Sequence, residues 1–160
     1  IMMKSCKIKT YVANLAVWNV KLHNIHWNVV GPYFRPVHEY TEQLYDEAFE
    51  AFDSVAELLK MRNDMPPATM KVFLERATIE EVEPRAFDCC EAVAMVEADM
   101  QKMLELAREI RNEAAEADDF EVQGMFEGFI GGFMKQLWFL RAMRSKAADC
   151  SAESSCCCGK

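Results

Sequence analysis

The sequence predicts an all-α fold, a four-helix bundle with a short extra helix in the long crossover between helices two and three. Three observations support this prediction. The chain has 160 residues, of which 51% are hydrophobic, enough for one domain with a single core. Gly (6) and Pro (5) are few, whereas Met (11) is abundant. Apolar residues recur at intervals of three and four along four long segments.

The first predicted helix covers residues 8–29 and contains no Gly or Pro. Its inner stripe is Ile8, Tyr11, Leu15, Trp18, Leu22, Ile25 and Val29. Gly31 and Pro32 end this helix, and Pro36 is suited to the first turn of the second. The second helix runs to about Met61, with an inner face of Val37, Thr41, Leu44, Ala48, Phe52, Val55 and Leu59.

A long connection follows the break at residues 65–67 and holds one short apolar-patterned segment, residues 69–77. Asp88 is a candidate cap for the third helix, whose stripe is Cys89, Val93, Val96, Met100, Met103, Ala107 and Ile110. Asp118 and Glu121 have the spacing of a second cap, for a fourth helix. Its apolar residues are Val122, Phe126, Phe129, Phe133, Leu137 and Leu140.

Two connections are short, so the first two helices and the last two helices each form an antiparallel pair. The long crossover between the second and third helices then runs the whole length of the bundle. This is the ferritin-like variant of the four-helix bundle. We expect residues 1–146 to form this ferritin-like domain and residues 147–160 to be a disordered Cys-rich tail, because the tail has no apolar period.

Charge and cysteine usage narrow the possible functions. Eighteen Lys+Arg against 26 Asp+Glu give a net charge of −8, which repels phosphates and suits cations. No apolar stretch approaches the roughly 20 residues that span a bilayer, and no signal peptide is visible. The seven cysteines are odd in number and clustered, which argues for a reducing compartment. We therefore expect a cytoplasmic protein without membrane contact.

Metal chemistry is restricted by the positions of the three histidines. The usual di-iron site of such bundles needs Glu-x-x-His motifs on two helices. No Glu precedes His23, His26 or His38 by three residues, so the inventory excludes that site. Each histidine alone is also consistent with a structural hydrogen-bonding or capping role.

Acids on the second helix offer another arrangement. They recur at three and four residues on a stripe roughly opposite the apolar one: Glu39, Glu42, Asp46, Glu50, Asp53 and Glu57. One interpretation is a solvated outer face. The other is that part of the stripe meets a second subunit and supplies carboxylates to a shared metal, with Asp53 and Glu57 one turn apart. Imidazole with carboxylate, and open positions, is typical of redox iron rather than structural zinc.

Several sequence segments resemble the Dps family of mini-ferritins. They are residues 21–34 (KLHNIHWNVVGPYF), 37–39 (VHE), 44–47 (LYDE), 53–57 (DSVAE), 68–71 (ATMK), 78–81 (TIEE) and 137–142 (LWFLRA). The resemblance covers residues 8–144. It implies a homo-oligomer, a hollow dodecamer, that oxidises Fe(II), preferentially with hydrogen peroxide rather than oxygen, and stores the ferric product.

The resemblance also implies a ferroxidase centre across a two-fold interface. His26, His38 and Glu42 would come from one subunit, and Asp53 and Glu57 from its neighbour, with His26, His38, Asp53 and Glu57 carrying the catalysis. It selects His26 over His23, which spacing does not. Glu42 stands where many members have Asp.

Other family features are matched less closely. Trp27 matches a tryptophan near the family's centre, where it would quench oxidising equivalents; it is equally consistent with an interface-packing aromatic. A cluster of acids lies where the family has three-fold pores, though a solvated turn explains it as well: Glu113, Glu116, Asp118, Asp119 and Glu121. Gly124, Gly128 and Gly132 are unusual and lie at four-residue spacing with Gly131 beside them.

DNA-binding members use basic tails, and here only Lys4, Lys7 and Lys9 precede the first helix core. We therefore predict weak or absent DNA binding. Two alternatives to an iron-storing ferroxidase remain: a nucleoid-associated DNA-protecting cage with incidental ferroxidase activity, and a helical scaffold without metal. The cysteine tail is open to a neutral role, redox sensing, soft-metal capture or disulfides between cages.

Overall fold

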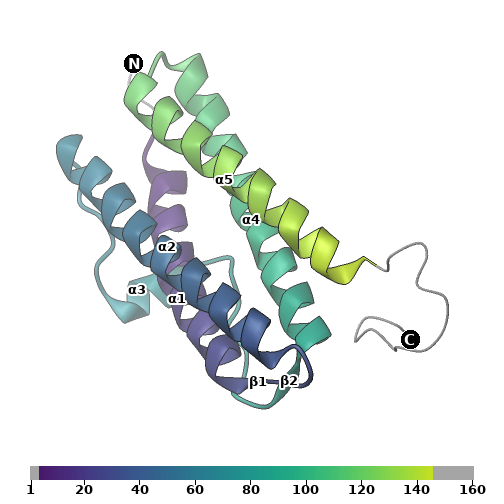
Figure 1. Ribbon diagram of the computed structural model, residues 1–160. Coiled ribbons are helices and arrows are strands. Elements are labelled where there is room, and N and C mark those ends of the chain that lie inside the picture. The colour runs from purple at the N-terminus through teal and green to yellow at the C-terminus, as the bar shows by residue number, and fades with distance from the viewer. Residues whose placement is uncertain (1–3, 146–160) are drawn as a thin grey trace.

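Four long helices in two antiparallel pairs form the bundle in the computed structural model, which describes residues 4–145 (Figure 1). Helix α1 (Cys6–Asn28) packs on α2 (Phe34–Met61), and α4 (Cys89–Glu116) packs on α5 (Phe120–Arg144). The short helix α3 (Met70–Arg76) lies in the crossover against α1. The all-α prediction and the short crossover helix are confirmed.

The predicted apolar stripes form the core. Every member of the α1 and α4 stripes is buried, because each helix turns one continuous apolar face inward. On α2 and α5 the same holds except for Phe52, Phe129 and Phe133, which are only partly buried. Within residues 4–145, no helix combines the length and apolarity needed to cross a membrane.

A two-stranded parallel sheet joins the first half of the bundle to the second. Strand β1 (Val29–Val30) pairs with β2 (Phe87–Asp88), in the register Val29 with Phe87 and Val30 with Asp88. The prediction that the first helix includes Val29 is therefore wrong by one residue. Val29 is buried, as its place in the apolar stripe predicts. Its backbone is extended (ψ 138°) and pairs with a segment about sixty positions later. Helical periodicity cannot predict such a long-range pairing.

The turn after β1 depends on Gly31, whose φ of +117° is a conformation that residues with a side chain rarely adopt. Gly31 lets the chain reverse within a few residues and start α2 at Phe34. Helix α2 consequently lies antiparallel to α1 and brings the residues near its start beside the end of α1 (Figure 1).

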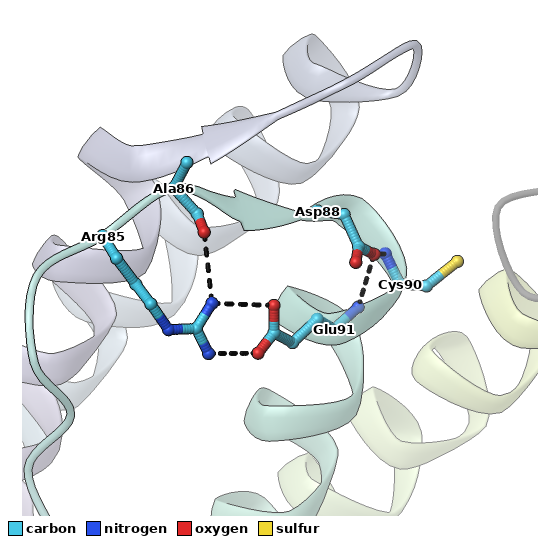
Figure 2. A network of polar contacts seen from close by, with 5 residues as sticks. All are labelled: Arg85, Ala86, Asp88, Cys90 and Glu91. Atoms are coloured by element: carbon cyan, nitrogen blue, oxygen red, sulfur yellow. Dashed lines mark hydrogen bonds and ion pairs between the residues drawn. The ribbon is translucent and has the colours of Figure 1, made fainter.

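The N-terminus of α4 is capped as the sequence predicts. The Asp88 carboxylate accepts hydrogen bonds from the backbone N–H groups of Cys90 (2.9 Å) and Glu91 (3.0 Å), as Figure 2 shows. The Arg85 guanidinium bridges the Glu91 side chain and the Ala86 carbonyl, so the end of the crossover is fixed to the first turn of α4.

The start of α5 differs from its prediction. Asp118 does not cap the helix: it lies in the turn at φ +54°, and Asp119 occupies the cap position without a side-chain cap bond. The buried Asp119 carboxylate instead binds the Arg62 guanidinium through both oxygens, at 2.8 and 2.7 Å. This ion pair ties the end of α2 to the start of α5, a long-range partnership that a local capping motif does not include.

Candidate metal centre

The end of α1 and the start of α2 bring His26 and His38 together. Their rings stack with centroids 3.6 Å apart and 19° between planes. Each ring is held reciprocally: His26 Nδ1 lies 2.8 Å from the His38 carbonyl oxygen, and His38 Nδ1 lies 2.8 Å from the His26 carbonyl oxygen. His26 is buried and His38 half-buried.

These hydrogen bonds decide which ring nitrogen can bind a metal. A carbonyl oxygen only accepts, so both Nδ1 atoms carry a proton and donate it. In a neutral imidazole this leaves the lone pair on Nε2, and a backbone carbonyl on the opposite nitrogen is a usual partner of a metal-binding histidine. The pair therefore presents two oriented nitrogen ligands.

Two residues that were not among the predicted site residues contact this pair. Thr41 is buried, and its hydroxyl oxygen lies 2.9 Å from the Val37 and His38 carbonyl oxygens, which share its one hydrogen, and 3.3 Å from His26 Nδ1. The Tyr45 ring meets His26 edge-on at 5.2 Å and stacks on His23 at 3.8 Å. Partial burial and the nearby carboxylates of Glu42 and Asp46 raise the pKa of Tyr45. One sequence signal marks Thr41 and Tyr45: they follow His38 at three- and four-residue spacing, which places them on the same side of α2.

His23 differs from the other two histidines. Its Nδ1 bonds the Asn19 carbonyl of its own helix at 2.8 Å, and its ring lies between Tyr45 and Trp27 rather than against His38. The structure therefore pairs His26, not His23, with His38, as the family resemblance implies.

The predicted carboxylates are all exposed on α2, but Asp53 and Glu57 lie far from the histidines of the same chain. Glu42 lies one turn after His38. Asp53 follows His38 by fifteen residues, which is about 22 Å along a helix that rises about 1.5 Å per residue. Within residues 4–145, no group of three or more His, Cys, Asp or Glu side chains is placed to hold a metal ion. The predicted ligands of a single subunit thus form two separate half-sets, one at each end of α2.

Comparisons with known proteins agree with this fold. A family model described as the ferritin-like domain matches residues 7–149. The DNA protection during starvation protein of Brevibacillus brevis is 38% identical over 131 residues, covering 82% of this chain and 87% of that protein. The crystal structure of a Dps protein from Bacillus brevis superposes with a TM-score of 0.83 and 35% identity, covering 90% of this chain and all of that one. The chain belongs to the Dps family.

A second relative has the same fold. Antigen TpF1 of Treponema pallidum is 32% identical over 136 residues, covering 85% of this chain and 77% of that protein. Its crystal structure has a TM-score of 0.84 and covers 86% of this chain and 88% of that one. This Dps-family chain is therefore a mini-ferritin with the ferritin-like bundle.

The remaining predicted residues of this Dps protein have distinct environments. Trp27 is 69% exposed and contacts the His23 ring at 5.4 Å. Among the predicted pore acids, Asp119 is buried in its pair with Arg62 and Glu113 pairs with Lys7, whereas Glu116, Asp118 and Glu121 lie around the turn between α4 and α5. Residues 147–160, the predicted Cys-rich tail, lie outside the described residues.

Proposed function

We propose that this protein is a ferroxidase and an iron-storing mini-ferritin. It oxidises Fe(II) to Fe(III), with hydrogen peroxide as the preferred oxidant over oxygen, at a site shared by two subunits, and holds the ferric product in a dodecameric cage. The observation that carries the proposal is the His26–His38 pair with both Nε2 atoms available. We place this activity in the cytoplasm, because the seven cysteines are odd in number and clustered, which is typical of a reducing compartment.

The register of α2 supports a two-fold arrangement of the half-sets. His38 and Glu57 lie equally far from the midpoint between residues 47 and 48, and so do Glu42 and Asp53. A two-fold axis through this midpoint, with two α2 helices antiparallel, places each residue opposite its counterpart, because a two-fold interface pairs the same surface with itself. Phe49, 64% exposed and near the midpoint on the same stripe, supplies an apolar contact for such an interface.

The ligand chemistry fits iron as substrate. Asp53 and Glu57 would bind one Fe(II) through hard oxygens, with His26 of the other subunit completing its ligands, and His38 with Glu42 would hold a second Fe(II). The two Fe(II) ions give one electron each. These two electrons break the O–O bond of one peroxide, which takes up two protons and leaves as two water molecules. Paired one-electron donors thus avoid release of a hydroxyl radical.

Mixed assemblies test both the residues and the shared site. One variant carries His26→Ala with His38→Ala, and the other carries Asp53→Ala with Glu57→Ala. Each alone should lose iron oxidation, measured by Fe(III) absorbance after anaerobic Fe(II) loading and peroxide or oxygen addition. Co-assembly at equal amounts should restore about one quarter of the wild-type rate, because half of the two-fold pairs are mixed and each has one intact site.

His23→Ala is the matched control, since His23 lies on the same helix but binds its own backbone; it should retain iron oxidation. No recovery in mixed assemblies of confirmed mixed composition would place the site within one subunit and contradict the shared centre. Unchanged oxidation in both parent variants would contradict the ligand assignment altogether.

A further inference from the structure

The predicted inner face of α2 contains one polar residue, Thr41, which is 0% exposed. A buried hydroxyl is unfavourable unless it has hydrogen-bond partners, and a valine would fill nearly the same space without needing any. Packing alone therefore does not call for threonine at this position. The other members of the face are all apolar: Val37, Leu44, Ala48, Phe52, Val55 and Leu59.

The Thr41 hydroxyl lies between the backbone of its own helix and the ring of His26. Its oxygen is 2.9 Å from the carbonyl oxygens of Val37 and His38, and 3.3 Å from His26 Nδ1. A hydrogen bond to the carbonyl four residues earlier is common for threonine in helices, and by itself it would explain the Val37 contact. The His26 contact has no such local explanation, because α1 supplies that ring.

The direction of the Thr41 hydrogen follows from these contacts. Carbonyl oxygens only accept, so the single hydroxyl hydrogen points to the carbonyls of α2. The hydroxyl oxygen keeps its lone pairs for the proton on His26 Nδ1. This proton consequently has two acceptors, the His38 carbonyl oxygen at 2.8 Å and Thr41 Oγ1 at 3.3 Å.

Thr41 thereby contacts both partners of the hydrogen bond that joins the two histidines. It touches the His26 nitrogen that donates and the His38 carbonyl that accepts. A hydrogen bond at one imidazole nitrogen sets the tautomer and the orientation of the ring, and it leaves the other nitrogen as the ligand.

We propose that Thr41 is a positioning residue for the histidine pair, whose hydroxyl keeps the His26 ring in the tautomer and orientation that present Nε2 to a divalent metal ion. The inference rests on the proposed iron site and deepens it. Removing such an outer partner of a metal ligand typically lowers metal affinity by about 10- to 100-fold. We expect the lower end of this range, because the His38 carbonyl remains as a closer acceptor.

Two pairs of variants isolate the hydroxyl from the size of the side chain. Wild type and Thr41→Val differ by a hydroxyl at constant shape, and Thr41→Ser and Thr41→Ala repeat the comparison without the methyl group. Cobalt(II), titrated into the assembled protein without oxygen and followed by its visible absorption, measures metal affinity in the absence of turnover. The part of the absorption that His26→Ala removes belongs to the histidine site. Within each pair, the hydroxyl-free protein should bind cobalt(II) about tenfold more weakly.

The tautomer of His26 is a second readout, which a purely structural role of Thr41 would not change. The chain has only 3 histidines, so ¹⁵N-histidine labelling of the sedimented assembly gives few resonances in solid-state NMR, and His26→Ala assigns the one of interest. Metal-free wild type should carry the His26 proton on Nδ1. Thr41→Val should show a second population with the proton on Nε2, where it blocks the ligand lone pair.

Thr10→Val is the matched control. The Thr10 hydroxyl lies 3.3 Å from the Cys6 carbonyl oxygen of its own helix. Thr10 precedes His26 by sixteen residues, which is about 24 Å along α1. The same substitution there should leave cobalt(II) affinity and the His26 tautomer unchanged.

Equal cobalt(II) affinities within both pairs, with an unchanged His26 tautomer, would overturn the positioning role and leave the iron site standing. A loss that follows the missing methyl group rather than the missing hydroxyl would also overturn it, because packing would then be the cause. If His26→Ala removes none of the cobalt(II) absorption, the proposed iron site fails, and this inference fails with it.

Discussion

Two asparagine side chains on α1 hold the long crossover in place. Asn14 is fully buried: its Oδ1 accepts from the backbone N–H groups of Thr78 (2.7 Å) and Ile79 (3.2 Å), and its Nδ2 donates to Thr78 Oγ1 (3.0 Å). Asn24 is half-buried and donates once, to the Val82 carbonyl at 2.8 Å. Helical periodicity marks neither residue as special, because their partners lie about sixty positions away.

Replacing Asn14 should therefore cost more than replacing Asn24. Asn14→Ala leaves two backbone N–H groups and one hydroxyl without their partner, and we expect a loss of about 2–3 kcal/mol in the free energy of unfolding. Asn24→Ala releases the Val82 carbonyl and the Asn28 amide, which keeps the Asn24 carbonyl as a second acceptor; both are nearer to solvent, and the change should cost about 1 kcal/mol. Denaturant unfolding of the matched variants measures both, and equal losses would contradict the anchoring role of Asn14.

At the scale of the elements, ion pairs connect helix ends and faces that are distant in sequence. Lys21 on α1 and Asp99 on α4 form a buried pair at 2.7 Å, where burial raises the pKa of Asp99 despite the opposing effect of Lys21. Lys9 on α1 meets Asp64, just after α2, at 2.7 Å. The hydrogen bond from Lys9, with a further one from Ser5, lowers the pKa of Asp64 from 3.8 to about 2.

This lowered pKa predicts a pH-dependent contribution to stability. The contribution is fully present above about pH 4 and is lost as the pH falls towards 2, because the unfolded chain then binds the proton first. Asp64→Asn should lower the unfolding midpoint at pH 6, and the difference from wild type should shrink as the pH approaches 2. Thermal unfolding across this range measures it.

Lys9→Met provides the control for that measurement. It should produce a similar loss at pH 6, and the Lys9→Met, Asp64→Asn double variant should add little further loss, because both changes remove the same contact. A difference that stays constant from pH 6 to pH 2 would show that the Asp64 charge does not carry the effect.

At the scale of the whole molecule, the distribution of charge determines how strongly the protein can bind DNA. Of the three N-terminal lysines, Lys7 pairs with Glu109 and Glu113, and Lys9 pairs with Asp64. Two of the few cations that a DNA-binding N-terminus would use are thus paired with carboxylates of the same chain, and the net charge of the chain is −8. Similarity to proteins named for DNA protection does not change this charge.

We accordingly predict that the assembled protein shifts DNA weakly or not at all at about 150 mM salt, since phosphate contacts weaken steeply with salt. A gel-shift titration from low to physiological salt measures this. A shift that persists at 150 mM salt would contradict the prediction and favour the nucleoid-associated alternative.

Local sequence patterns predict the helices, their inner faces and the Asp88 cap, because each depends on residues within one or two turns of one another. Local rules were wrong at Val29, which pairs with Phe87, and at Asp118, because the cap position falls on Asp119, whose carboxylate binds Arg62. The prediction of His26 over His23 came from the family resemblance, and only the structure shows the reciprocal hydrogen bonds between His26 and His38.

The contact between Thr41 and His26 was likewise decided by tertiary structure, since it depends on where the start of α2 meets the end of α1. Periodicity records which face of a helix is buried. It does not record which distant atoms contact that face, and the pairing of His26 with His38 depends on such contacts.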